Sequence, residues 1–191
     1  MGEASAHNRR FAGDAAMERY ADGDPRGFEE LYDLLAPRLW AYALRRTRNP
    51  SVAKDVVQQT FLKIHAARGR FIRGAPVLPW AFAIAARLVS DGAREGRYEL
   101  LETAPDGELP DVASSDASAD AVLQAKALAH RLEQALERLP CKQREAFQLI
   151  RQEELSYADA ARVLGTSVVT VKLRVHRARL ALRDVLGDET A

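Results

Sequence analysis

The chain has 191 residues, of which 47% are hydrophobic and 29% are charged, and its formal net charge is +1. This composition allows a buried core in a soluble protein, and no apolar run is long enough to span a bilayer. Met1–Phe11 lacks the apolar segment of a secretion signal, and the single cysteine, Cys141, excludes a disulfide framework or a multi-cysteine metal site. We therefore expect a cytoplasmic protein without membrane insertion.

The charges are distributed unevenly along the chain. Residues 96–120 hold one basic and seven acidic residues, whereas the segments on either side are mildly basic. Arg45–Arg73 contains eight basic residues and one acid, and Ser167–Arg183 contains five basic residues and no acid. The acidic stretch therefore masks two basic segments in the total charge.

The first half of the chain shows helical spacing of apolar residues, and sustained period-2 alternation is absent from the sequence. Asp24-Pro25, a capping residue followed by proline, predicts the start of a first helix that runs through Leu44. The tripeptide at 49–51 separates it from a helix that carries residues 52–64. After a segment with glycine and arginine, a third helix is predicted to begin near Pro79-Trp80.

Residues 97–120 interrupt the helical pattern with prolines, serines and acids, and they contain few large apolar side chains. Such a segment buries too little surface to offset its ordering entropy, which predicts a flexible linker, with an ordered acidic loop as the alternative. Helical spacing resumes near residue 119. The predicted fold is all-α, with helical domains over residues 1–96 and 119–191 joined by a flexible acidic linker over residues 97–118.

The C-terminal segment has the signals of a helix-turn-helix. Ser156, followed three residues later by Asp159, predicts the capped start of a short helix over 157–164. Gly165 can end that helix in the left-handed conformation, and residues 166–167 can cap a second one. A short helix, a turn with glycine and a longer helix form the helix-turn-helix pattern.

The second helix of this pair has two distinct faces. The seam predicted to face the core consists of Val168, Val171, Val175, Ala178, Leu182 and Val185. The opposite face holds Val169, Thr170, Lys172, Leu173, His176 and Arg177, with Arg174 and Arg179 on its flanks. Its donors suit phosphates and guanine edges, and its methyl groups suit thymine. A solvated charged face is the alternative, but the absence of acids and the preceding turn favour DNA contact.

These residues resemble a known family. The motifs at 139–140, 143–145, 155–157, 160–161, 164–165, 170–172, 174 and 176–179 are similar to region 4 of bacterial extracytoplasmic-function (ECF) sigma factors. Residues 28–31, Ala53–Leu62, Trp80, Ile84-Ala85, Asp91 and Arg94 are similar to their region 2. Two blocks in the right order are more specific than a lone helix-turn-helix.

The resemblance implies a protein that binds core RNA polymerase and promoter DNA, with region 2 at the polymerase clamp and the −10 element and region 4 at the −35 element. The polymerase-binding candidates are Asp55, Gln58 and Gln59, a polar group beside Phe61 and Leu62 that suits a mixed interface. An ordinary amphipathic helix is the alternative, but it leaves the two glutamines without a role. The −35 candidates are the eight outward residues from Val169 to Arg179.

The candidates for the −10 element are Arg73, Trp80, Ile84 and Arg87. Cations and aromatics can hold unstacked single-stranded bases, although core packing is expected for the Trp80 ring. Ala86-Arg87 replaces the usual Arg-Asn pair, Val169 replaces a glycine and Leu173 replaces a serine. We therefore expect a different promoter preference, with more contact to thymine methyl groups.

The resemblance also implies control by an anti-sigma factor, and the nearest branch suggests a zinc-containing one. The zinc would belong to the partner, because the four histidines have no useful ligand spacing, and we expect no metal or cofactor in this chain. Two other functions are alternatives to a sigma factor. The first is a helix-turn-helix regulator that occupies an operator without joining polymerase, and the second is a hydrolytic enzyme. The sequence has no phosphate loop, nucleophile motif or carboxylate pair that would support an enzyme.

Overall fold

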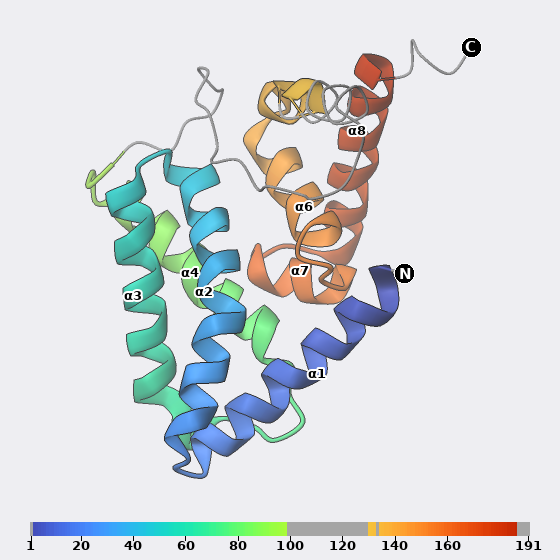
Figure 1. Ribbon diagram of the computed structural model, residues 1–191. Helices are drawn as coiled ribbons and strands as arrows, with labels where there is room; N and C mark the ends of the chain where they lie inside the picture. The colour runs from blue at the N-terminus through green and yellow to red at the C-terminus, as the bar shows by residue number, and fades with distance from the viewer. Residues whose placement is uncertain (1, 99–129, 133, 187–191) are drawn as a thin grey trace, which may run out of the picture.

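A computed structural model describes residues 2–98, 130–132 and 134–186, with the side chains of 2–11 and 184–186 left out (Figure 1). The helices are α1 (Gly2–Ala21), α2 (Pro25–Thr47), α3 (Pro50–Ala67), the short 3-10 helix η1 (Arg68–Arg70), α4 (Val77–Arg94), α6 (Cys141–Arg151), α7 (Tyr157–Val163) and α8 (Val168–Leu186). Residues 130–132 and 134–138 are also helical. The described residues contain no strand, which confirms the all-α class.

Most of the predicted linker and the start of the helix that follows it lie outside the described residues. None of the described helices is both long enough and apolar enough to pass through a membrane.

Two helix starts in the first half follow the predicted capping signals. The Asp24 carboxylate accepts a hydrogen bond from the backbone N–H of Arg26 at 3.0 Å, and a proline opens α2. The Asn49 side chain accepts from the N–H groups of Ser51 and Val52 at 3.0 and 3.2 Å, and again a proline opens the helix. These contacts confirm the predicted starts of α2 and α3.

The helix that begins at Pro25 is not the first in the chain, as the sequence had suggested, because α1 precedes it. α1 packs on α2 through small side chains: a Cβ atom on Gly27 would lie 2.6 Å from the Ala16 carbonyl oxygen. Met17 is fully buried in the contact. The Asp14 carboxylate accepts from the Val77 N–H at 2.7 Å, so α4 starts two residues earlier than predicted. With few large apolar residues, α1 has a weak periodic signal, which explains the error.

Most buried apolar side chains form one cluster that extends across both halves of the chain, and a second, smaller cluster joins residues 135–139 to Ala178 and Leu182 of α8. The larger cluster contains Tyr42 and Phe82, whose rings meet edge to face at 5.4 Å, and also Leu149 and Val163. α7 packs directly against α4. The N-terminal helices and the helix-turn-helix therefore share a core and do not stand apart.

Candidate nucleic-acid interface and apolar groove

The helix-turn-helix is confirmed in its local geometry. The Ser156 hydroxyl accepts from the Asp159 N–H at 3.0 Å and donates to the Asp159 carboxylate at 2.7 Å, which starts α7. Gly165 has φ of +58°, the left-handed conformation that glycine adopts without steric cost. The Ser167 hydroxyl accepts from the Thr170 N–H at 3.1 Å and starts α8.

α8 buries one face and exposes the other. The buried seam consists of Val171, Val175, Ala178 and Leu182. Val168, predicted to belong to this seam, instead keeps 38% of its surface exposed at the first position of the helix. The side chain of Val185 lies outside the described residues.

The eight predicted DNA-binding residues all lie away from this seam. Val169, Lys172, Leu173, His176, Arg177 and Arg179 are exposed, and Thr170 and Arg174 are partly buried. Val169 and Leu173 are 75% and 46% exposed, although valine and leucine are usually buried in a core. Within the part of the chain that the structure describes, no carboxylate pairs with the lysine or the arginines of this face. The face is therefore cationic and apolar, a combination that suits phosphates and thymine methyl groups.

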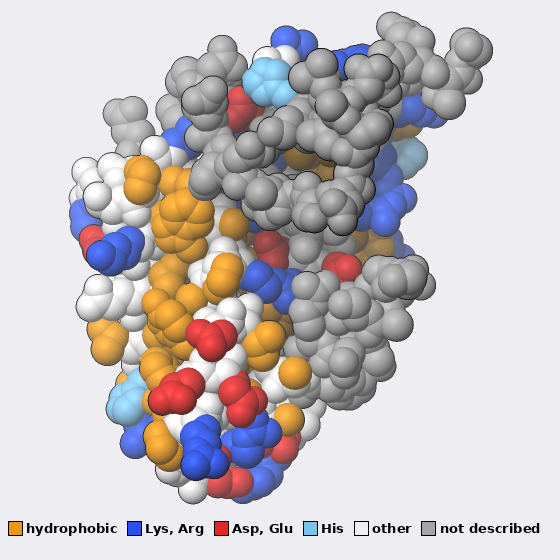
Figure 2. All heavy atoms as spheres, viewed as in Figure 1, with side chains coloured by type: hydrophobic (Ala, Val, Ile, Leu, Met, Phe, Trp, Pro, Cys, Tyr) orange, Lys and Arg blue, Asp and Glu red, His pale blue; other side chains and the backbone are white. Residues whose placement is uncertain are grey.

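A groove of about 1020 Å³ lies between α2 and α3 and is lined mainly by apolar side chains. Figure 2 shows hydrophobic side chains along the face where these two helices run side by side. Of the predicted polymerase-binding residues, Gln58, Phe61 and Leu62 line the groove. Asp55 and Gln59 are exposed on α3 but do not line it.

The groove is also lined by aromatic residues of α2, which were not predicted from the sequence as part of a binding site. The Tyr32 ring lies 4.8 Å from the Phe61 ring, and the Phe28 ring lies 5.8 Å from it. Tyr32 is 46% exposed, and Leu62 is 53% exposed. The available signal was the i, i+4 spacing of Phe28 and Tyr32, which places both on one side of a helix. Exposed aromatic and aliphatic side chains in one groove are typical of a protein-binding site.

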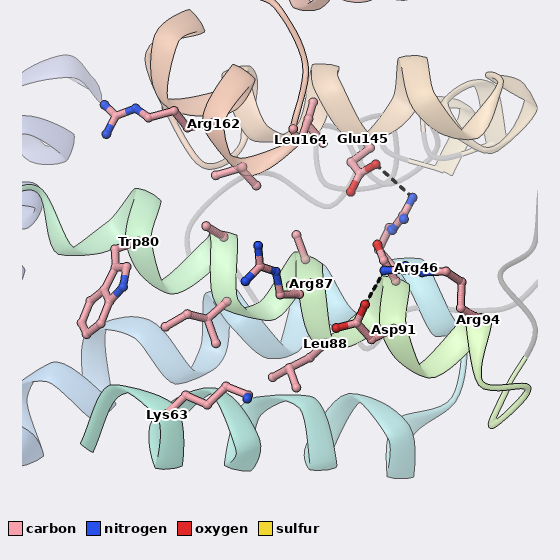
Figure 3. A pocket seen from close by; sticks show the side chains of 16 residues that line it. Arg46, Lys63, Trp80, Arg87, Leu88, Asp91, Arg94, Glu145, Arg162 and Leu164 are labelled. Carbon is pink, nitrogen blue, oxygen red and sulfur yellow. Dashed lines mark hydrogen bonds and ion pairs between the residues drawn. The ribbon is translucent and has the colours of Figure 1, made fainter. Parts of the chain in front are cut away.

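The four residues predicted for the −10 element lie on α4 and the loop before it. Trp80, Ile84 and Arg87 line a crevice of about 520 Å³ between α4 and the turn after α7. Arg87 is exposed, and Figure 3 shows its side chain in the space between α4 and α7. The Trp80 ring packs against Phe71 at 5.6 Å, as expected for core packing.

Arg73 does not line the crevice. It is exposed on the loop between η1 and α4 and pairs with Asp22 from the end of α1.

Two buried carboxylates link the halves of the chain, and the sequence did not indicate them. Glu145 of α6 accepts from the Tyr42 hydroxyl at 2.7 Å and pairs with Arg46 at 3.1 Å. Glu153, which follows α6, pairs with Arg38 at 2.9 Å and with Arg45 at 3.1 Å. We call these six residues the clasp. Its three arginines and its tyrosine all belong to α2.

Burial changes the proton affinities in the clasp. It raises the pKa of Tyr42 well above its ordinary value of 10, and the adjacent Glu145 raises it further. It lowers the pKa of Arg45, an effect that Glu153 opposes. At Arg46, burial also acts to lower the pKa, but Glu145 more than offsets it and the pKa is raised. The two arginines stay charged and Tyr42 stays neutral at physiological pH.

No group of three or more metal-ligating side chains occurs among the described residues. The candidate surfaces on the described residues are the outer face of α8, the groove between α2 and α3, and the α4 side of the crevice.

Two protein-family models match separate parts of the chain. The family model of sigma-70 region 2 matches residues 31–98, which contain the groove helices and α4. The model of sigma-70 region 4 matches residues 129–182, which contain the helix-turn-helix.

The chain is also similar to individual proteins over most of its length. It is 34% identical to RNA polymerase sigma factor CarQ of Myxococcus xanthus over 173 residues, which cover 90% of this chain and 96% of CarQ. It is 35% identical to ECF RNA polymerase sigma factor EcfG of Rhodopseudomonas palustris over 156 residues, which cover 81% of this chain and 83% of EcfG.

Two solved complexes contain chains of similar structure. CnrH in complex with the cytosolic domain of CnrY matches with a TM-score of 0.60 and 25% identity, over 94% of this chain and 99% of the other. The sigma factor RpoE of Bartonella quintana, in complex with the anti-sigma factor NepR, matches with a TM-score of 0.60 and 26% identity, over 85% and 98%.

Proposed function

The chain belongs to the ECF RNA polymerase sigma factors, and from this premise we propose which of its surfaces binds each partner. As a sigma factor it directs core RNA polymerase to promoters and starts transcription there. The groove between α2 and α3 binds core polymerase, the α4 side of the crevice contacts the −10 element, and the outer face of α8 contacts the −35 element. Core polymerase and promoter DNA as partners support a cytoplasmic location.

The observation that carries the proposal is the separation of two chemically different surfaces in the two matched regions. The groove is wide, mostly apolar and edged by polar side chains such as Gln58 and Lys54, which suits a protein partner. The α8 face combines exposed cations with Val169 and Leu173 and has no acid, which suits DNA. An operator-binding regulator would need the second surface but not the first.

Core polymerase binding tests this division. The purified full chain should bind core polymerase, and the mixture should start transcription from a subset of promoters in a genomic template library. Arg87→Ala and Arg177→Ala should each lower promoter-dependent initiation while leaving polymerase binding intact. Arg26→Ala is the matched control, because Arg26 is an exposed cation on α2 away from all three surfaces. Failure of the full chain to bind core polymerase would refute the proposal.

We further propose that a regulator protein competes with polymerase for the groove. The two similar solved structures are both complexes with a second protein, and one of these is an anti-sigma factor. An amphipathic helix could cover Tyr32, Phe61 and Leu62 in the groove. A regulator recovered with the chain from its native cell should be displaced by excess core polymerase. Metal analysis of that regulator would test the prediction that it contains zinc.

A further inference from the structure

The loop between η1 and α4, residues 71–76, presents an isoleucine to solvent. Ile72 is 76% exposed and lies between the exposed cations Arg70 and Arg73. The preceding side chain, Phe71, instead packs inward on the helix that follows the loop. Apolar side chains can insert between bases that have lost their stacking, and cations beside them bind phosphates. The tip of the loop therefore has the chemistry of a contact to unpaired DNA.

A tight turn gives the loop its shape. The backbone N–H of Ala75 donates to the carbonyl oxygen of Ile72 at 3.0 Å. Gly74, the third residue of this turn, has φ of +76°. A positive φ at the third position is the mark of a type II turn, and glycine adopts it without steric cost. The turn alone does not fix where the loop lies relative to the helices.

Two acids of α1 hold the backbone of the loop in place. The Glu18 carboxylate accepts from the Gly74 N–H at 2.8 Å, and the Asp14 carboxylate accepts from the Val77 N–H at 2.7 Å. The two acids are four residues apart, so they lie on one side of α1. Figure 1 shows the loop beside the end of this helix, and α1 contacts both η1 and α4. Since both bonds go to backbone groups, they set the position of the loop itself.

A third acid, four residues further along, makes a different kind of contact. Asp22 pairs with the Arg73 side chain, and the two side chains are 52% and 67% exposed. Exposed ion pairs contribute little to stability because water solvates both partners well. A phosphate can therefore replace Asp22 on the guanidinium without disturbing the loop backbone.

We propose that Asp14 and Glu18 are positioning residues for promoter opening, which hold the loop so that Ile72 and Arg73 meet the unpaired strand of the −10 element. A loop already held in its binding shape loses less conformational entropy when the strand arrives. Asp22 acts in the opposite direction, because it occupies Arg73 until a phosphate replaces it. The role in promoter opening rests on the proposed function, whereas the positioning of the loop by α1 does not.

Amide hydrogen exchange in the full chain, followed by NMR, tests the positioning without DNA. Glu18→Ala removes the acceptor and should speed exchange of the Gly74 amide, whereas Glu18→Gln keeps an acceptor oxygen and should not. Glu30→Ala is the matched control, because Glu30 is an exposed acid that pairs with Arg19 of α1. Amides of α6 report any general loss of stability and should exchange as in the parent. An unchanged rate at Gly74 in Glu18→Ala would overturn the positioning.

Permanganate reactivity of unpaired thymines tests promoter opening, in complexes of the full chain, core polymerase and a promoter selected from the genomic library. Glu18→Ala should lower the reactivity about fivefold, the equivalent of one hydrogen bond, while core polymerase binding stays constant. Ile72→Ala should lower it as well. Asp22→Ala should raise it, because Arg73 is released. Glu18→Gln should not lower it, since the acceptor is kept.

The directions of these changes separate positioning from charge. Removing an acid near DNA strengthens phosphate attraction by itself, so a pure charge effect would raise the reactivity in Glu18→Ala, Glu18→Gln and Asp22→Ala alike. That result, or an equal loss in both Glu18 variants, would overturn the role of Glu18 in promoter opening. A chain that never binds core polymerase would refute the proposed function and with it this role. The exchange of the Gly74 amide would then still decide whether α1 positions the loop.

Discussion

The substitution Leu62→Ala tests the groove without disturbing the core, although side chains of α3 contribute to both. The Leu62 side chain is 53% exposed at the groove, and a polymerase surface seated there would cover that half. Burying a whole leucine side chain is worth about 1.5–3 kcal/mol, so covering half of one is worth about 1 kcal/mol. At 1.4 kcal/mol for each tenfold change, Leu62→Ala should weaken core polymerase binding about fivefold.

Two controls show whether the loss belongs to the groove. Ile64→Ala, two positions along α3, removes a fully buried side chain and should lower the free energy of unfolding by about 2–5 kcal/mol. Ile72→Ala removes a side chain that is 76% exposed but lies outside the groove, and it should leave polymerase binding unchanged. Affinity is measured by titration of labelled protein with core polymerase, and stability by urea unfolding. Equal weakening by Leu62→Ala and Ile72→Ala, or no weakening by either, would refute the role of the groove.

Three other outcomes are expected. Arg177→Ala should lower initiation in a run-off assay about tenfold while core binding stays constant, because an exposed base or phosphate contact is lost. The free energy of unfolding should fall as pH rises above 10, because Tyr42 ionises there in the unfolded chain but only at higher pH in the folded one. Urea titrations on either side of pH 10 measure this slope, and Tyr42→Phe should flatten it. Gly27→Ala should destabilise the protein by about 2 kcal/mol in urea unfolding, since its Cβ would meet the backbone of α1, whereas Gly69→Ala, with open space around it, should not.

The helices with strong local signals could be predicted from the sequence. Asp24 and Asn49 cap helices through short-range hydrogen bonds, and Gly165 ends one through its own backbone freedom, so these features depend on few neighbours. The outward face of α8 was also predictable, because helical periodicity alone separates Arg177 from Val175.

Features that depend on distant residues could not be predicted in the same way. α1 is held by close approach to Gly27 and by the bond from Val77 to Asp14, neither of which leaves a periodic pattern. The groove was only half recognised, because Tyr32 and Phe61 meet across two helices. The pairing of Glu153 with α2 depends on the packing of the two halves, which no local pattern encodes.

The clasp shows why the contact between α2 and the C-terminal half contains charged residues. Apolar residues of similar volume at positions 145 and 153 would often give equal or greater stability, because buried ion pairs pay heavily for desolvation. Such an interface would also be less specific in register, because apolar contacts have no preferred direction. Charged partners instead fix one register through the fork geometry of Arg38 on Glu153, and each carboxylate regains its hydration once the halves separate. A clasp of this composition favours one arrangement of the two halves without adding much net stability.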